Sequence, residues 1–199
     1  MTGIITGDIV NSREQATAQW LLELKNTLYT FGNTPKGWEV YRGDSFQLEI
    51  EPKQALSAAI LIKSSIKTHK GLDVRMAIGL GKKTYDSEKI TESNGSAFVN
   101  SGACFEQMKK NTLAIKSPFH DFDSTINIML DLAQLTMNSW STTSSLIIKT
   151  SLENPELNQS EIAKLLGKSQ SNISEGLKRG GFEEISKLIN YYTSQIERL

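Results

Sequence analysis

The first 120 residues alternate between short apolar runs and amphipathic segments. Consecutive or alternating apolar residues predict strands, whereas apolar residues spaced three or four positions apart predict helices. Turn residues separate the segments, as at Gly32-Asn33 and at Pro52. In chain order we expect strand 3–8, helix 19–31, strands 38–41 and 46–50, a helix that begins at Pro52 and is ended by Lys70-Gly71, strand 74–81, a helix around 97–108 and strand 112–116.

The resulting order, β-α-β-β-α-β-α-β, predicts an α+β protein. It is close to the ferredoxin-like or split βαβ sandwich, in which a mostly antiparallel sheet carries its helices on one face. Residues 38–50 are expected to form a hairpin with Asp44 near its tip. Trp20, Trp38 and Trp140 are expected to fill the core.

From Asp121 onward the pattern is helical only, so we expect an α/β domain over 1–120 and an all-α domain over 121–199. Residues 158–179 have the spacing of a helix-turn-helix. Asn158 and Ser169 are predicted to cap its two helices, and Gly167 to take the turn between them. Apolar residues at helical spacing fill the predicted seam, namely Ile162, Leu166, Ile173 and Leu177.

Charge and cysteine content narrow the range of partners. Lys+Arg and Asp+Glu are both 22, so no global field draws the chain to nucleic acid or anionic lipid. The single cysteine, Cys104, excludes an internal disulfide and is expected to be buried. The N-terminus lacks the pattern of a signal peptide, and no apolar run has the roughly 20 residues of a membrane span. We therefore expect a cytoplasmic protein without membrane contact.

The second helix of the predicted helix-turn-helix supplies candidate DNA-binding residues. Glutamine and asparagine amides can pair with adenine, and serine and lysine can bind phosphates. The alternative is a three-helix packing module without a nucleic-acid role, because residues 140–199 contain seven basic and seven acidic side chains. The candidates are Ser169, Gln170, Ser171, Asn172, Ser174 and Lys178.

Asp8 and Asp44 are the candidate metal ligands. Asp8 ends the first predicted strand and Asp44 lies in the hairpin turn, so the two carboxylates are expected to converge if both strands join one sheet. Paired carboxylates can hold a divalent ion against phosphates. The alternative for each is structural, since Gly-Asp is common in turns and an aspartate after a strand often caps a helix.

Four short motifs in this order resemble the nucleotide cyclase fold of class III adenylyl cyclases and GGDEF diguanylate cyclases. With the helix-turn-helix behind them, nearly the whole chain resembles the SatD-like family of small bacterial proteins. The motifs are Gly7-Asp8-Ile9-Val10, Arg42-Gly43-Asp44-Ser45-Phe46, Arg75-Met76-Ala77-Ile78-Gly79-Leu80-Gly81 and Gly95-Ser96-Ala97-Phe98-Val99-Asn100.

The resemblance implies that Asp8 and Asp44 bind Mg²⁺ or Mn²⁺ carrying a nucleotide triphosphate. The amides of residues 9–12 suit a phosphate at a strand-to-helix turn. The nucleotide-binding residues implied are Ile9, Asn11, Ser12, Lys82 and Asn100, with Lys83 as the alternative to Lys82. Arg75 is a further phosphate contact, or a surface charge paired with Glu39 or Glu49.

Two departures weigh against cyclisation. Cyclases carry an arginine four residues after the asparagine that matches Asn100, and this chain has Cys104 there. The base-reading lysine of adenylyl cyclases is replaced by Val40. These departures favour a DNA-binding regulator whose first domain binds a nucleotide and metal or mediates homodimerisation. An active nucleotidyl cyclase or nucleotide-cleaving enzyme, and a non-catalytic scaffold, are the alternatives.

Overall fold

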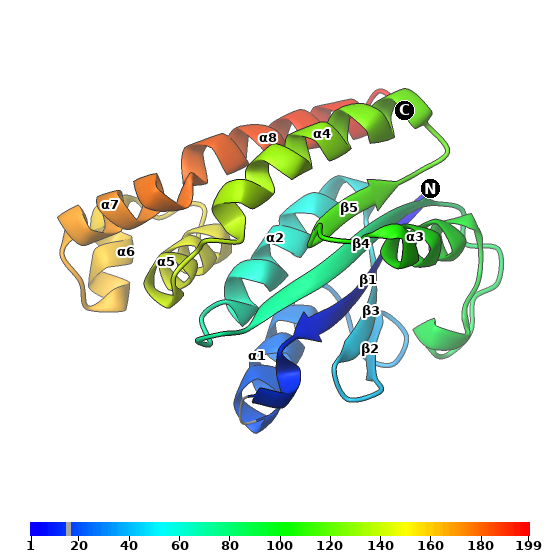
Figure 1. The fold of residues 1–199 in the computed structure, drawn as a ribbon, viewed down its shortest axis with the longest axis horizontal. Coiled ribbons are helices and arrows are strands. Elements are labelled where there is room, and N and C mark those ends of the chain that lie inside the picture. The colour runs from blue at the N-terminus through cyan, green and yellow to red at the C-terminus, as the bar shows by residue number, and fades with distance from the viewer. Residues whose placement is uncertain (15–16) are drawn as a thin grey trace.

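The computed structural model describes residues 1–14 and 17–199 and has an α+β fold built on one five-stranded mixed sheet (Figure 1). The strands are β1 (Thr2–Val10), β2 (Trp38–Tyr41), β3 (Ser45–Ile50), β4 (Asp73–Gly81) and β5 (Leu113–Lys116). Their order across the sheet is β2-β3-β1-β4-β5. The pairs β2–β3, β1–β3 and β1–β4 are antiparallel, and β4–β5 is parallel. The expected mostly antiparallel sheet is confirmed.

Eight α-helices lie within the described residues, and those of the first 120 residues lie close to the positions expected from the sequence. They are α1 (Thr17–Tyr29), α2 (Ala55–Ile66), α3 (Ser96–Gln107), α4 (His120–Met137), α5 (Thr142–Glu153), α6 (Gln159–Leu166), α7 (Gln170–Gly180) and α8 (Phe182–Ile196). Trp20, Trp38 and Trp140 are buried, as expected. In the described parts of the chain, none of the helices is both long and apolar enough to cross a membrane.

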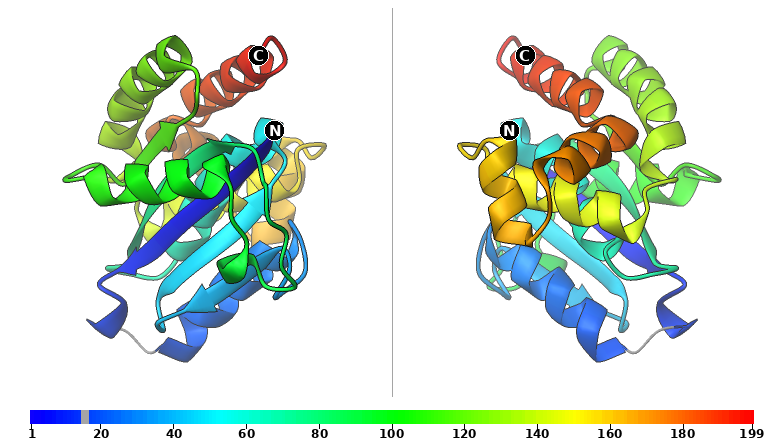
Figure 2. Two further views of the ribbon diagram at one scale, coloured as in Figure 1. Left: turned by 90° about the vertical axis from the view of Figure 1, so that its right-hand side faces the viewer. Right: turned by 90° about the vertical axis from the view of Figure 1, so that its left-hand side faces the viewer.

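The helices cover both faces of the sheet, so the expectation of a single helical face was wrong. Helices α1 and α2 pack on one face, and α3 packs on the other against β1 and β4 (Figure 2). Because β5 runs parallel to β4, the chain must cross the sheet between them, and α3 is that crossover. Small residues on β4 admit it: a Cβ on Gly79 would lie 2.2 Å from the Ser101 nitrogen.

Helix α4 seals the free edge of β5 with three side chains spaced along one face. The Asn127 amide accepts from the Ile115 N–H and donates to the Ile115 carbonyl, both at 2.9 Å. The Gln134 Oε1 accepts from the Leu113 N–H at 2.8 Å, and Asp123 accepts from the Ser117 N–H at 2.8 Å. These bonds satisfy backbone groups that an edge strand otherwise leaves unpaired.

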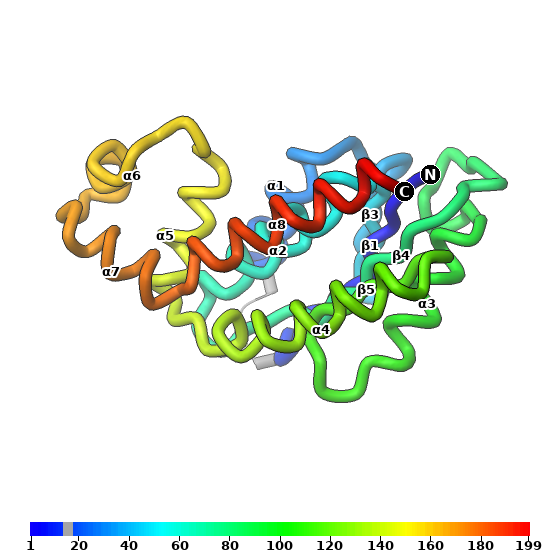
Figure 3. Tube along the Cα trace, turned by 90° about the horizontal axis from the view of Figure 1, so that it is seen from above, coloured from blue at the N-terminus to red at the C-terminus, as the bar shows by residue number. Residues whose placement is uncertain are grey.

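One hydrophobic core extends across the boundary expected at residue 120. It joins the α1–α2 face of the sheet to buried residues of α4, α5 and α8. Helix α8 returns alongside α4 (Figure 3), and its Tyr192 hydroxyl donates to the Pro52 carbonyl at 2.7 Å. Helices α6 and α7 build a smaller cluster with α5, around Ile147, Ile162 and Ile173.

A buried ionic cluster ties α2 to β4 beneath this core. The Lys63 ammonium is fully buried and donates to Asp73 Oδ1 at 2.6 Å and to Thr112 Oγ1 at 3.1 Å. Lys67 donates to the second Asp73 oxygen at 3.2 Å and to the Asn138 carbonyl at 2.9 Å. Burial lowers the pKa of Lys63 to about 8, although Asp73 acts in the opposite direction.

Candidate functional sites

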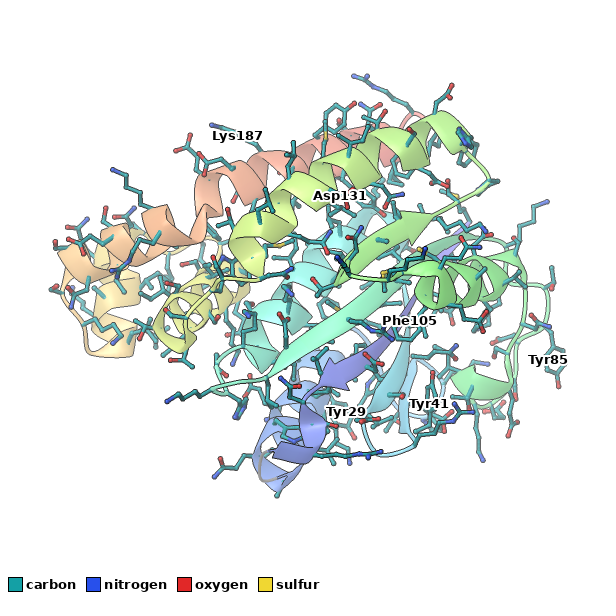
Figure 4. The ribbon with its side chains drawn as sticks, in the orientation of Figure 1. Tyr29, Tyr41, Tyr85, Phe105, Asp131 and Lys187 are labelled. Atoms are coloured by element: carbon teal, nitrogen blue, oxygen red, sulfur yellow. The ribbon has the colours of Figure 1, made fainter. Side chains whose placement is uncertain are left out.

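Four side chains line up across the α3 face of the sheet, one from each of four strands. Register places Tyr41 opposite Ser45, Ser45 opposite Asp8, and Asp8 opposite Arg75. We call these four residues the cross-sheet row; Tyr41 is labelled in Figure 4. Burial raises the pKa of the Tyr41 hydroxyl, with a smaller contribution in the same direction from the Asp8 carboxylate. The first expected metal ligand therefore lies in a row of polar side chains.

Arg75 neutralises Asp8 instead of pairing with Glu39 or Glu49. Its Nη2 lies 3.2 Å from Asp8 Oδ2, and its Nε lies 3.3 Å from Oδ1, which makes the contact bidentate. The guanidinium also lies 4.7 Å from the ring centroid of Phe105 on α3 (Figure 4). Both charged side chains remain about one-third exposed. The ion pair is consequently screened by solvent but held in place by the aromatic ring.

Glu39 and Glu49 have other partners. Glu39 accepts from Thr91, and Glu49 accepts from Lys83 at 2.7 Å. The pairing proposed for Arg75 from sequence was therefore wrong, because antiparallel register puts Asp8 directly beside it.

Asp44 directly precedes Ser45, the residue opposite Asp8, but its side chain is engaged elsewhere. Its Oδ2 accepts from the Ser12 hydroxyl at 2.7 Å. Its carbonyl accepts from the Ile9 N–H at 3.0 Å, so this amide is not free to bind a phosphate in the observed conformation. Asn11 has a φ of 62°, and its side-chain amide donates to the Gly71 carbonyl at 3.1 Å. The segment 9–12 is thus fixed by bonds within the chain.

This arrangement does not fit a divalent ion as it stands. Asp8 has a cationic partner in Arg75, and Asp44 is hydrogen-bonded to Ser12. Within residues 1–14 and 17–199, no three His, Cys, Asp or Glu side chains gather as potential ligands. Divalent Mg²⁺ and Mn²⁺ favour several oxygen ligands without a competing cation.

Lys82 and Asn100 lie near the end of the sheet opposite to Asp8. Asn100 donates to the Leu80 carbonyl at 2.8 Å, and the exposed Lys82 follows directly on Gly81. Gly81 pairs with Thr2, at the opposite end of β1 from Asp8. At about 3.4 Å per residue this separation is roughly 20 Å. One copy of the chain therefore does not bring the five implied nucleotide-binding residues together.

The two residues that depart from the cyclase pattern, Cys104 and Val40, both lie in apolar surroundings. Cys104 is buried against Ala77 and Met108, and burial raises the pKa of its thiol to about 11. Val40 packs partly buried against the main core. Neither position supplies a charge or a hydrogen-bonding group for a nucleotide.

The segment of α6 and α7 folds as its capping residues predict. Asn158 caps α6 in a reciprocal capping box with Glu161, and Ser169 caps α7 through the Asn172 N–H. Gly167 ends α6 in the left-handed region, with a φ of 61°. On the buried side of α7, a Cβ at Gly176 would lie 2.4 Å from Ile147 Cδ1. The missing side chain of Gly176 therefore lets α7 pack closely on α5.

The outer side of α7 is polar and exposed along its whole length. All six expected DNA-binding residues are exposed: Ser169, Gln170, Ser171, Asn172, Ser174 and Lys178. The Gln170 amide donates to Gln159 Oε1 at 2.9 Å, so the first residues of α6 and α7 touch. Residues 159–180 contain four basic and two acidic side chains, which gives this segment a net charge of +2. The acidic residues that balance the wider segment 140–199 lie mostly on α5 and α8.

Sequence reasoning overlooked two residues that the structure adds to these sites. Gln159 has a visible signal, because it directly follows the predicted cap Asn158. Phe105 has none, since its place over Arg75 depends on how α3 packs on the sheet. No family model, curated protein or solved structure matches this chain.

Proposed function

We propose that the chain is a DNA-binding transcriptional regulator that acts through a helix-turn-helix formed by α6 and α7. The observation that carries this proposal is the exposed polar face of α7, which follows a capped α6 and a left-handed glycine turn. A recognition helix presents its first residues to base edges in the major groove. Here those residues are Gln170, Ser171 and Asn172.

The contact between Gln159 and Gln170 supports base reading. An amide held by a second amide has fewer free rotamers, so less side-chain entropy is lost when it binds adenine in a bidentate manner. Lys178 and Arg179 lie exposed at the other end of α7, where cationic side chains can bind phosphates. The local charge of +2 is modest, which favours a protein that binds DNA as a pair of modules.

The sheet with its α1–α3 helices is proposed as the regulatory or dimerising part of the protein. The proposal rests on the resemblance to nucleotide cyclases, whose domains commonly pair so that a site forms between protomers. Such pairing can place Asn100 or Lys82 of one copy near the cross-sheet row of another. Cyclase turnover is not part of the proposal, because Cys104 stands where the arginine is expected.

Selection from random duplex DNA followed by gel retardation tests the DNA proposal. We expect a preferred site, and we expect Gln170→Ala combined with Asn172→Ala to weaken that site by roughly tenfold or more while leaving non-specific binding nearly unchanged. A variant carrying Gln107→Ala and Asn26→Ala, both at exposed positions outside α6 and α7, is the matched control. A protein that retards no DNA at low salt contradicts the proposal.

A further inference from the structure

A cavity of about 690 Å³ opens between the end of α3, the loop that follows it, β5 and the first half of α4. It is separate from the cross-sheet row and from α7, and Asp131 on α4 marks one of its walls (Figure 4). Its volume lies within the range of roughly 300–1,000 Å³ that is usual for small-molecule sites. The apolar part of the lining comes from Met108, Ala114 and Ile115.

The acidic side chains that line this cavity are hydrogen-bonded within the fold, whereas its lysine side chains, in the described parts of the chain, are not. Asp123 accepts two hydrogen bonds from Ser117, at 2.6 and 2.8 Å, and Asp131 accepts one from Asn111 at 2.7 Å. Both carboxylates are thus occupied by bonds within the fold. The basic side chains that line the cavity are Lys109, Lys110, Lys116 and His120.

The three lysines have no such partners. Across residues 1–14 and 17–199, none of them takes part in an ion pair or a side-chain hydrogen bond. Three ammonium groups against two internally bonded carboxylates leave a net positive charge at the cavity. Lysine acts as a point charge toward phosphate, so such a set suits an anion with several oxygens.

The start of α4 contributes to the same wall. This helix has 18 residues, its first residue His120 lines the cavity, and the preceding Phe119 makes no side-chain cap. Backbone N–H groups in the first turn of a helix carry partial positive charge and favour anions. Asp121 and Asp123 in this first turn offset part of that charge, so the preference of the cavity for anions comes mainly from the three lysines.

From this combination of an apolar floor and cationic walls, we infer that the cavity binds a phosphorylated small molecule whose phosphate lies between the lysines and the start of α4. An aromatic or otherwise apolar part of the ligand packs on Met108 and Ile115. The inference is independent of the DNA proposal, because the cavity contains no residue of α6 or α7.

Titration of the ¹⁵N-labelled full chain with adenosine 5′-monophosphate, adenosine and inorganic phosphate tests the inference by two-dimensional NMR. We expect the monophosphate to shift amides within 108–116 and 120–124 and to bind more tightly than phosphate alone, whereas adenosine alone leaves the spectrum unchanged. Replacing Lys109 and Lys110 together by glutamine is expected to weaken the monophosphate about tenfold or more. Replacing the exposed Lys25 and Lys70 in the same way is the matched control.

Three outcomes overturn the inference. The first is the absence of shifts up to about 10 mM of the monophosphate, which corresponds to an affinity too weak for a built site. The second is a set of shifts confined to the cross-sheet row and residues 9–12, which places the phosphate at the aspartates instead. The third is a lysine variant that binds the monophosphate normally but loses DNA affinity, which makes the lysines a contact to the DNA backbone. Circular dichroism of each variant confirms that it is folded.

Discussion

Asp73→Asn tests whether the buried ionic cluster is held together by one carboxylate. This carboxylate is 19% exposed and serves both Lys63, which is 0% exposed, and Lys67, which is 9% exposed. Asparagine keeps the shape and one acceptor oxygen but removes the charge, so two buried ammonium groups lose their counter-ion. Loss of one partner from a buried pair costs about 3–5 kcal/mol, a large share of the roughly 5–15 kcal/mol that stabilises a typical domain.

Lys63→Met provides the opposite perturbation at the same cluster. It replaces the buried ammonium by an apolar side chain of similar length and leaves Asp73 bonded to Lys67 and to the Val74 N–H. Because Asp73 keeps Lys67 as its counter-ion, this variant leaves no buried charge of the cluster unpaired, so we expect a change of about 1–2 kcal/mol or less in either direction. The exposed pair Lys187–Glu183 is the surface control, and Lys187→Gln is expected to change stability by at most about 0.5 kcal/mol.

The pH dependence follows from the lowered pKa of Lys63. Between about pH 8 and 10.5 the unfolded chain holds the Lys63 proton more firmly than the folded one, so this group makes the free energy of unfolding rise with pH. At about 1.4 kcal/mol per pH unit, the upper limit of this gain is roughly 3 kcal/mol. Without the Asp73 carboxylate the Lys63 pKa falls further. The difference in the free energy of unfolding between Asp73→Asn and the unmodified protein is therefore expected to become smaller from pH 7 to pH 9.5.

Urea unfolding followed by tryptophan fluorescence at pH 7 and pH 9.5 measures these differences. Two results refute the reasoning. One is a decrease in the free energy of unfolding below about 1 kcal/mol for Asp73→Asn at pH 7, and the other is a decrease for Lys63→Met as large as that for Asp73→Asn. An unchanged difference between the two pH values contradicts the assignment of the lowered pKa to Lys63.

Two further predictions concern the edge strand and the α6–α7 turn. Gln134→Leu leaves the Thr112 and Leu113 N–H groups without an acceptor, so we expect a loss of about 2–4 kcal/mol and faster amide exchange at Leu113, with Gln107→Ala unchanged. Gly167→Ala meets no atom within 4 Å but forces an L residue into the left-handed region, so we expect a loss of about 1–2 kcal/mol by urea unfolding. The helical Gly102, which also has open space, is the control, because alanine there is expected to stabilise the protein by about 0.5–1 kcal/mol. Equal losses at both glycines contradict the backbone argument.

Local features of the chain were predictable from sequence because their causes lie within a few residues. The caps Asn158 and Ser169 and the glycine turn at Gly167 set the limits of α6 and α7 as expected. Burial of Trp20 also follows directly from its place on an amphipathic helix. Capping and helical periodicity act over one or two turns, so a single sequence is sufficient to read them.

The candidate site at the aspartates was predicted only in part. The sequence predicts that Asp8, at a strand end, and Asp44, in the hairpin turn, converge if both strands join one sheet. Both strands do join one sheet, and Asp8 lies opposite Ser45, the residue after Asp44. The partners that decide their chemistry, Arg75 and Ser12, were not foreseen in those roles. A cross-strand partner depends on register, and a shift of one residue turns every side chain to the other face.

The sequence by itself determined the order and kinds of elements, the polar outer face of α7 and the absence of an arginine at position 104. Only the tertiary structure decided that α3 covers the opposite face of the sheet, that Arg75 neutralises Asp8, and that α4 seals β5. The physical reason is that most of these contacts join residues far apart in the chain, such as Arg75 and Asp8 at 67 positions, where pairing is set by competition among all surfaces that can be buried. Local propensity carries no information about the outcome of that competition.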